Sequence, residues 1–120
     1  MDSKESIQEL KDKVKKFCED RDWDKFHNPK DLAIGVITEA SELLEKVRFK
    51  SPKDIDLMFQ DKNKRQEISE ETADILYFLL RLAQKYNIDL TEELNKKMIK
   101  NDKKYPLEKA KGSNKKYSEL

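Results

Sequence analysis

Residues 72–83 read TADILYFLLRLA and contain the longest dense apolar run of the chain. A helix that is apolar almost all round is typical of a buried position. This stretch therefore predicts a buried helix over roughly Gln66 to Tyr86. The run from Ile75 to Ala83 is interrupted by Arg81 and is far too short to span a bilayer, which takes about 20 apolar residues. Asp74 lies inside the stretch, where an unpaired carboxylate would be costly.

Three further helices are predicted around this one. Apolar residues recur at helical spacing from Ser3 to Asp20 and from Asp31 to Arg48. A fourth helix is predicted to begin at Thr91, a residue suited to an N-cap, and to end at Pro106. The segment between the first two, Arg21–Lys30, is predicted to be irregular.

The segment Phe49–Arg65 is polar and is predicted to be mostly loop. Within it, Ser51 followed by Pro52 could cap a short helix. The sequence as a whole predicts an all-α fold, a bundle of four main helices.

The composition fits one helical domain with few apolar residues. The chain has 120 residues, 36% of them hydrophobic and 42% charged, and a formal net charge of +1. This balance argues against a strongly basic nucleic-acid-binding domain and against an acidic tail protein. We expect a single domain over residues 1–120 with a C-terminal tail from about residue 107. Because a chain of this size buries only about two thirds of its unfolded surface, we also expect a homo-oligomer.

Cellular location is predicted from what the sequence lacks. The one cysteine, Cys18, excludes an intramolecular disulfide and a cysteine zinc cage. The first residues have no apolar segment like that of a secretory signal. We therefore expect a cytoplasmic protein, with neither a membrane nor a nucleic acid polymer as partner.

Two pairs of carboxylates need an explanation: Glu39 with Glu42, and Glu71 with Asp74. Each pair has i, i+3 spacing, so its members share one helix face about 5–6 Å apart at Cβ and repel each other. One interpretation is neutralisation by some of the 26 lysines and arginines. The other is a metal site, because helix bundles build such sites from carboxylates on facing helices. All-oxygen ligands favour Mg²⁺, with Mn²⁺ as a possible substitute, and Mg²⁺ held this way usually also binds substrate phosphates.

Glu45 continues the series three residues after Glu42. It could be an outer ligand, a water-activating group, or a surface partner of Arg48 or Lys46. The surface pairing is slightly favoured.

The spacing of these pairs resembles a known family. E-x-x-E at Glu39 and Glu42, a gap of 28 residues, and E-x-x-D at Glu71 and Asp74 resemble the signature of the MazG-like nucleotide pyrophosphohydrolases. Further stretches resemble the dCTP pyrophosphatase branch of that superfamily: RDWDKFHNPKDLA (21–33), EASELLE (39–45), EETADILYFL (70–79), KM-x-x-N-x-x-KYP (97–106) and GSNKKYSEL (112–120). The resemblance implies cleavage of a nucleoside triphosphate between its α and β phosphates, giving nucleoside monophosphate and pyrophosphate. It also implies a MazG-like bundle assembled as a dimer of dimers.

The resemblance assigns roles to individual residues. It makes Glu39, Glu42, Glu71 and Asp74 the magnesium ligands and hence the catalytic residues. The residues it implies for substrate binding are Trp23, Phe26, His27, Phe49, Phe78 and Asn101. Without the resemblance, Trp23 and Phe26 would more often be core aromatics and His27 a capping or packing residue.

Four positions depart from the family pattern and leave the base preference open. Phe49 replaces a common tryptophan, and Phe78 replaces a tyrosine and so lacks its hydroxyl. Ile99 stands in place of an aspartate, and Val14 in place of a pocket histidine. The predicted substrate is dCTP, and the alternatives are dUTP or a non-canonical or purine triphosphate. A rival of another class is a non-enzymatic helical interaction module.

Overall fold

The computed structural model describes residues 1–120, and its regular elements are all helices, without a strand. The α-helices are α1 (Ile7–Asp20), α2 (Pro29–Val47), α3 (Pro52–Gln60), α4 (Lys62–Lys85), α5 (Leu90–Lys104) and α6 (Leu107–Ala110). Two short 3₁₀ helices, η1 (Asp24–Phe26) and η2 (Tyr117–Glu119), complete the elements. The all-α class is thus confirmed. No helix is both long and apolar enough to cross a lipid bilayer.

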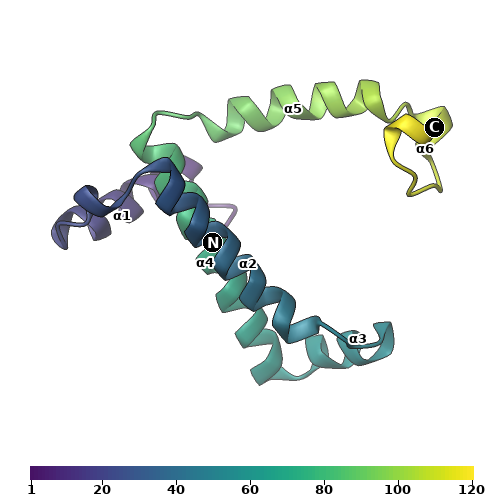
Figure 1. Ribbon diagram of the computed structural model, residues 1–120, viewed down its shortest axis with the longest axis horizontal. Coiled ribbons are helices and arrows are strands. Elements are labelled where there is room, and N and C mark those ends of the chain that lie inside the picture. Colours follow the sequence, from purple (N-terminus) through teal and green to yellow (C-terminus); the bar gives the residue numbers. More distant parts are fainter. The chain divides into compact units, whose positions relative to one another are not determined.

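The chain divides into two compact units, Met1–Asn87 and Ile88–Leu120. The first unit contains α1 to α4, and the second contains α5, α6 and η2. A single domain over residues 1–120 stays a prediction. Within the first unit α4 packs along α2 and also contacts α1 and α3 (Figure 1).

The prediction that Phe49–Arg65 is mostly loop is wrong, and the alternative of a short helix after Ser51 is confirmed. The Ser51 hydroxyl accepts from the Asp54 backbone N–H (3.1 Å), and Pro52 occupies the first turn of α3. Asp61 then ends α3 and begins α4, since its carboxylate accepts from the N–H groups of Asn63 and Lys64. These caps satisfy helix-end donors that would otherwise lack partners.

The start of α5 also differs from the prediction. The N-cap is Asp89 rather than Thr91, because the Asp89 carboxylate accepts from the Glu92 backbone N–H at 2.9 Å. Both residue types suit an N-cap, so composition alone did not distinguish them.

The core of the first unit is small, and α4 is buried on one side only. Cys18, Leu32, Leu80 and Ala83 are at most 4% exposed. Leu76 and Leu79 of α4, in contrast, are 42% and 40% exposed, so burial all round is wrong for the single chain. The physical reason is that α1, α2 and α3 cover only part of the circumference of α4.

The two central helices approach closely at Gly35 of α2. A Cβ added to Gly35 would lie 2.5 Å from ring carbons of Phe78 on α4. Carbon atoms in contact normally lie about 3.5–4.0 Å apart. The missing side chain of Gly35 is therefore what lets the Phe78 ring rest against the α2 backbone. This contact lies about one turn from Glu39 on α2 and one turn from Asp74 on α4.

Candidate metal centre and aromatic segment

The structure brings three of the four predicted carboxylates together. Ligand oxygens of Glu39 and Glu42 on α2 and of Glu71 on α4 all lie within 4.8 Å of one another. Asp74 is outside this group of three, although its charge still acts on Glu39. Asp74 is also exposed, which differs from the buried position that its apolar neighbours suggested.

Neutralisation by basic residues accounts for only part of the cluster. Lys46 Nζ lies 3.9 Å from a Glu71 oxygen and equally far from Glu67, so Glu71 has one weak ion pair. Oε2 of Glu39 and Oε2 of Glu71 are buried and have no hydrogen-bond partner. Buried carboxylate oxygens without partners are costly, which is the situation that a bound cation relieves. The donor set is all oxygen and fits Mg²⁺ or Mn²⁺.

The electrostatics of the cluster agree with this reading. Burial, together with the neighbouring carboxylates Glu42, Glu71 and Asp74, raises the pKa of Glu39 to about 7. Burial and Glu42 also raise the pKa of Glu71, although Lys46 acts in the opposite direction. Glu45 is not part of the cluster: it pairs with Arg48 at 3.0 Å, so the slightly favoured surface pairing is confirmed.

The aromatic segment Trp23–His27, which contains three of the implied binding residues, lies between α1 and α2. The Trp23 ring contacts Phe17 edge to face with centroids 5.6 Å apart, and it lies 6.3 Å from the His27 ring. Phe26 is 61% exposed, with Lys25 Nζ 5.4 Å from its ring centroid. Trp23 is thus partly packed, whereas Phe26 is not the core aromatic that composition alone suggested.

The other predicted pocket residues lie in three different places. Phe78 packs against Gly35 and contacts Tyr77 edge to face at 5.0 Å. Phe49 is 92% exposed just after α2, about two turns beyond Glu42, with the Arg48 guanidinium 4.5 Å from its ring centroid. Asn101 is on α5 in the other unit, so its relation to the carboxylates stays a prediction.

Sequence reasoning missed a small apolar hollow and a network of polar contacts around a buried arginine. The hollow has a volume of about 240 Å³ and is lined by Lys13, Val14, Phe17 and Tyr77. Beside it, the buried Cys18 Sγ lies 3.2 Å from the Tyr77 hydroxyl oxygen. Of the residues that line the hollow, only Val14 stands out in the sequence, as a departure from the family pattern.

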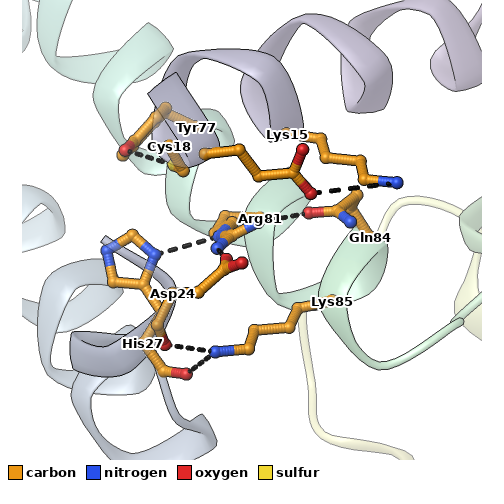
Figure 2. A network of polar contacts seen from close by, with 9 residues as sticks. Lys15, Cys18, Asp24, His27, Tyr77, Arg81, Gln84 and Lys85 are labelled. Atoms are coloured by element: carbon orange, nitrogen blue, oxygen red, sulfur yellow. Dashed lines mark hydrogen bonds and ion pairs between the residues drawn. The ribbon is translucent and has the colours of Figure 1, made fainter. Parts of the chain in front are cut away.

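The network centres on Arg81 of α4, which is 1% exposed and contacts Asp24, His27 and Gln84 (Figure 2). Its sequence signal was a charge inside the apolar run. Arg81 follows Glu71, the member of the carboxylate cluster on α4, by ten residues, which is about 15 Å along the helix axis. The carboxylate cluster and the segment that carries Trp23 therefore both lie along α4.

Paired carboxylates on packed helices define a class of helical proteins with acidic clusters between helices. Within that class the chain belongs to the MazG-like family, whose sequence profile matches residues 35–120. The resemblance inferred from the motifs is thus confirmed at the level of the family.

Named relatives agree with this assignment. Mouse dCTP pyrophosphatase 1 is 33% identical over 104 residues, covering 87% of this chain and 61% of that protein. Bovine dCTP pyrophosphatase 1 is 30% identical over 118 residues, covering 98% of this chain and 70% of that protein. The chain thus spans about three fifths of the length of the mouse relative. Among solved structures, a pyrophosphatase from Archaeoglobus fulgidus superposes with a TM-score of 0.75 at 36% identity, covering 83% of this chain and 92% of that one.

Proposed function

We propose that this chain is a nucleoside triphosphate pyrophosphohydrolase dependent on Mg²⁺, with Mn²⁺ as a substitute. It cleaves between the α and β phosphates, releases nucleoside monophosphate and pyrophosphate, and prefers dCTP, which clears this nucleotide from the cytoplasmic pool. The observation that carries the proposal is the carboxylate cluster across α2 and α4, with two buried oxygens that lack partners. The similarity to proteins named dCTP pyrophosphatase 1 supports the reaction and the substrate.

Glu39, Glu42, Glu71 and Asp74 would hold the metal ion. When bound, a divalent cation neutralises phosphate charge and makes a bound water more acidic. Glu39 gives up its proton before it can act as a ligand, because its pKa is about 7. Lys46 keeps one positive charge beside Glu71 and so limits the repulsion within the cluster. Either Glu42 or Glu45 orients the attacking water, and the Arg48 ion pair makes Glu45 the weaker candidate.

The nucleotide would lie along α4, with its triphosphate at the carboxylates and its sugar and base toward the aromatic segment. Trp23 offers a stacking face, and His27, Phe26 and Phe78 complete the binding residues together with Phe49 and Asn101. Phe78 carries no hydroxyl, so discrimination between cytosine and uracil rests on other groups. This makes dUTP, or a non-canonical or purine triphosphate, the competing substrate.

We also propose that the active form is a homo-oligomer, a dimer of dimers. Ile34, Ile37 and Leu44 of α2 are 53%, 67% and 56% exposed, and a second copy of the chain would cover them. Burial of such side chains is a main driving force of association. Sedimentation velocity should give a mass near four chains, and Ile37→Lys should reduce that mass. A wild-type protein that sediments as a single chain would contradict this assembly.

The reaction is tested by incubating the protein with Mg²⁺ and a panel of canonical and modified nucleoside triphosphates, with products separated by chromatography. We expect monophosphate and pyrophosphate, formed fastest from dCTP. Glu71→Gln should abolish turnover. The matched control is Glu70→Gln, an exposed neighbour on α4 that accepts a hydrogen bond from Gln66 (3.3 Å).

Each outcome of the panel has a clear meaning. If the same products form fastest from a nucleotide with another base, the proposed reaction stands and the proposed substrate is wrong. No turnover of any nucleotide with either Mg²⁺ or Mn²⁺ would refute the proposed enzymatic activity and favour a helical interaction module. Full activity in Glu71→Gln would refute the metal assignment.

A further inference from the structure

Arg81 is a buried charge whose donors all point at a few named partners. Its Nε–H donates to His27 Nδ1 (2.9 Å), and one terminal nitrogen donates to Gln84 Oε1 (2.6 Å). The other terminal nitrogen forms an ion pair with Asp24 (Figure 2). Asp24 and His27 lie in and beside η1, more than fifty residues away in the sequence. The guanidinium thus ties η1 to α4.

Stability alone does not explain an arginine at this position. Burial of the Arg81 guanidinium costs solvation free energy, and an ion pair with a partner as exposed as Asp24 (53%) offsets only part of that cost. The neighbours of Arg81 in the sequence are apolar, so a leucine would continue the run. What the arginine adds is geometry, since its planar, forked donors orient several acceptors at once.

A second residue of the same helix face strengthens this connection. Lys85, one turn after Arg81, donates to the backbone carbonyl oxygens of Asp24 (2.6 Å) and His27 (Figure 2). Arg81 binds side chains of the segment and Lys85 binds its backbone. Trp23 is held at the start of the same segment, against Phe17. The segment from Trp23 to His27 is therefore attached to α4 at both its side chains and its main chain.

The contact with Arg81 also decides which ring nitrogen of His27 carries the proton. Arginine Nε–H can only donate, so Nδ1 of His27 accepts and the ring proton lies on Nε2. Burial lowers the pKa of His27, and the positive charges of Arg81 and Lys85 lower it further. Asp24 and Asp31 act in the opposite direction but do not reverse the shift. His27 is thus neutral near pH 7 and presents one N–H donor on the side away from Arg81.

We propose that Arg81 is a positioning residue for nucleotide binding: it holds the Trp23–His27 segment on α4 and fixes His27 as an Nε2–H donor to a sugar or phosphate oxygen of the substrate. The inference rests on the proposed function for its nucleotide part only. It assigns His27 to binding and excludes it as general base, because the nitrogen that faces the substrate already carries a proton. This role rests on the contacts of Arg81 with Asp24 and His27, and not on the cluster of Glu39, Glu42 and Glu71.

The chain is well suited to a direct test, because it has one histidine and one tryptophan. Nitrogen-15 NMR of His27 reports its tautomer, and fluorescence reports the surroundings of Trp23. In the wild type we expect a neutral Nε2–H ring that titrates below about 6.5, the usual histidine pKa. An Nδ1–H ring, or titration at or above the usual pKa, would overturn the proposal without any variant.

The variant is Arg81→Met, which keeps an unbranched side chain and removes every donor. The matched control is Arg65→Met, an exposed arginine of the same helix. We expect Arg81→Met to give a mixture of His27 tautomers and a red-shifted Trp23 emission. We further expect the KM for the best nucleotide of the panel to rise about tenfold, the factor for one well-oriented hydrogen bond. The kcat and the Mg²⁺ affinity should change less than about threefold, since the carboxylates keep their contacts.

The outcomes separate this proposal from the proposed function. If Arg81→Met keeps the His27 tautomer, the Trp23 emission and the KM of the wild type, the positioning role is overturned. A fall in kcat with unchanged KM would overturn it as well, because a held binding segment acts on substrate affinity. If the wild type turns over no nucleotide, the proposed function is refuted and the nucleotide part of the role with it. An Nε2–H ring of His27 in the wild type, together with a shifted Trp23 emission in Arg81→Met, would then still establish that Arg81 holds the segment.

Discussion

The affinity of this chain for Mg²⁺ should rise steeply with pH, because one of the proposed ligands is half protonated near neutrality. With a pKa of about 7, Glu39 is ionised in about one molecule in eleven at about pH 6 and in about ten of eleven at about pH 8. A ligand carboxyl must be ionised to bind the cation, so the apparent affinity should rise about tenfold over this range from Glu39 alone. Glu71, whose pKa is also raised, adds to the rise.

The assay is isothermal titration calorimetry of the protein with MgCl₂ at several pH values. Near pH 7, binding should release about half a proton from Glu39, which is measured by repeating the titration in buffers of different ionisation enthalpy. Glu39→Gln is the control: its affinity should be lower and should depend less on pH. An affinity that is the same at pH 6 and pH 8, or binding without proton release, would refute the reasoning.

Three more predictions concern stability. Without metal, the free energy of unfolding should fall as pH rises from about 4.5 to about 7. The raised pKa of Glu39 makes the folded state bind more protons than the unfolded state in that window. Urea unfolding at several pH values measures this free energy, and a rise across the window would contradict the prediction. Gly35→Ala should lower stability by about 1–2 kcal/mol, because the added Cβ would lie 2.5 Å from the Phe78 ring and overpacking outweighs the gain in helix propensity. Gly35→Ala with Phe78→Leu should recover most of that loss, and a destabilisation that persists in the double variant would show that the ring is not the cause. Leu32→Ala should cost about 2–5 kcal/mol, since Leu32 is fully buried, and a loss below about 1 kcal/mol in chemical denaturation would contradict the burial.

The sequence predicted well those features that depend on local periodicity. The long helices and the carboxylate pairs followed from spacing, because i, i+3 and i, i+4 residues share a helix face wherever the helix lies. The acidic cluster of Glu39, Glu42 and Glu71 then needed only that α2 and α4 pack together. Helix α3 was underestimated because polar residues dominate its segment, while the caps at Ser51 and Asp61 decide its bounds.

Features that depend on distant residues were not predictable in this way. The charge of Arg81 inside an apolar run was visible, but its partners lie more than fifty residues away and no spacing rule connects them. The exposure of Leu76 and Leu79 was also hidden, because periodicity identifies apolar residues without telling which surface covers them. The contact of Phe78 with Gly35 required knowledge of how closely two helices approach.

Phe49 combines two properties that rarely occur together in a large side chain. Its backbone is left-handed, with φ at 65°, and its ring is 92% exposed. For a residue other than glycine this backbone conformation costs about 1–2 kcal/mol, and a ring that is almost fully exposed contributes little packing to offset that cost. A library randomised at position 49 and sorted for resistance to heat should therefore enrich glycine and asparagine. The same library sorted for growth on a toxic modified nucleotide should retain aromatic residues, if the ring meets the substrate. A comparison of the two enrichments would show how far the residues that favour growth at position 49 differ from those that favour thermodynamic stability.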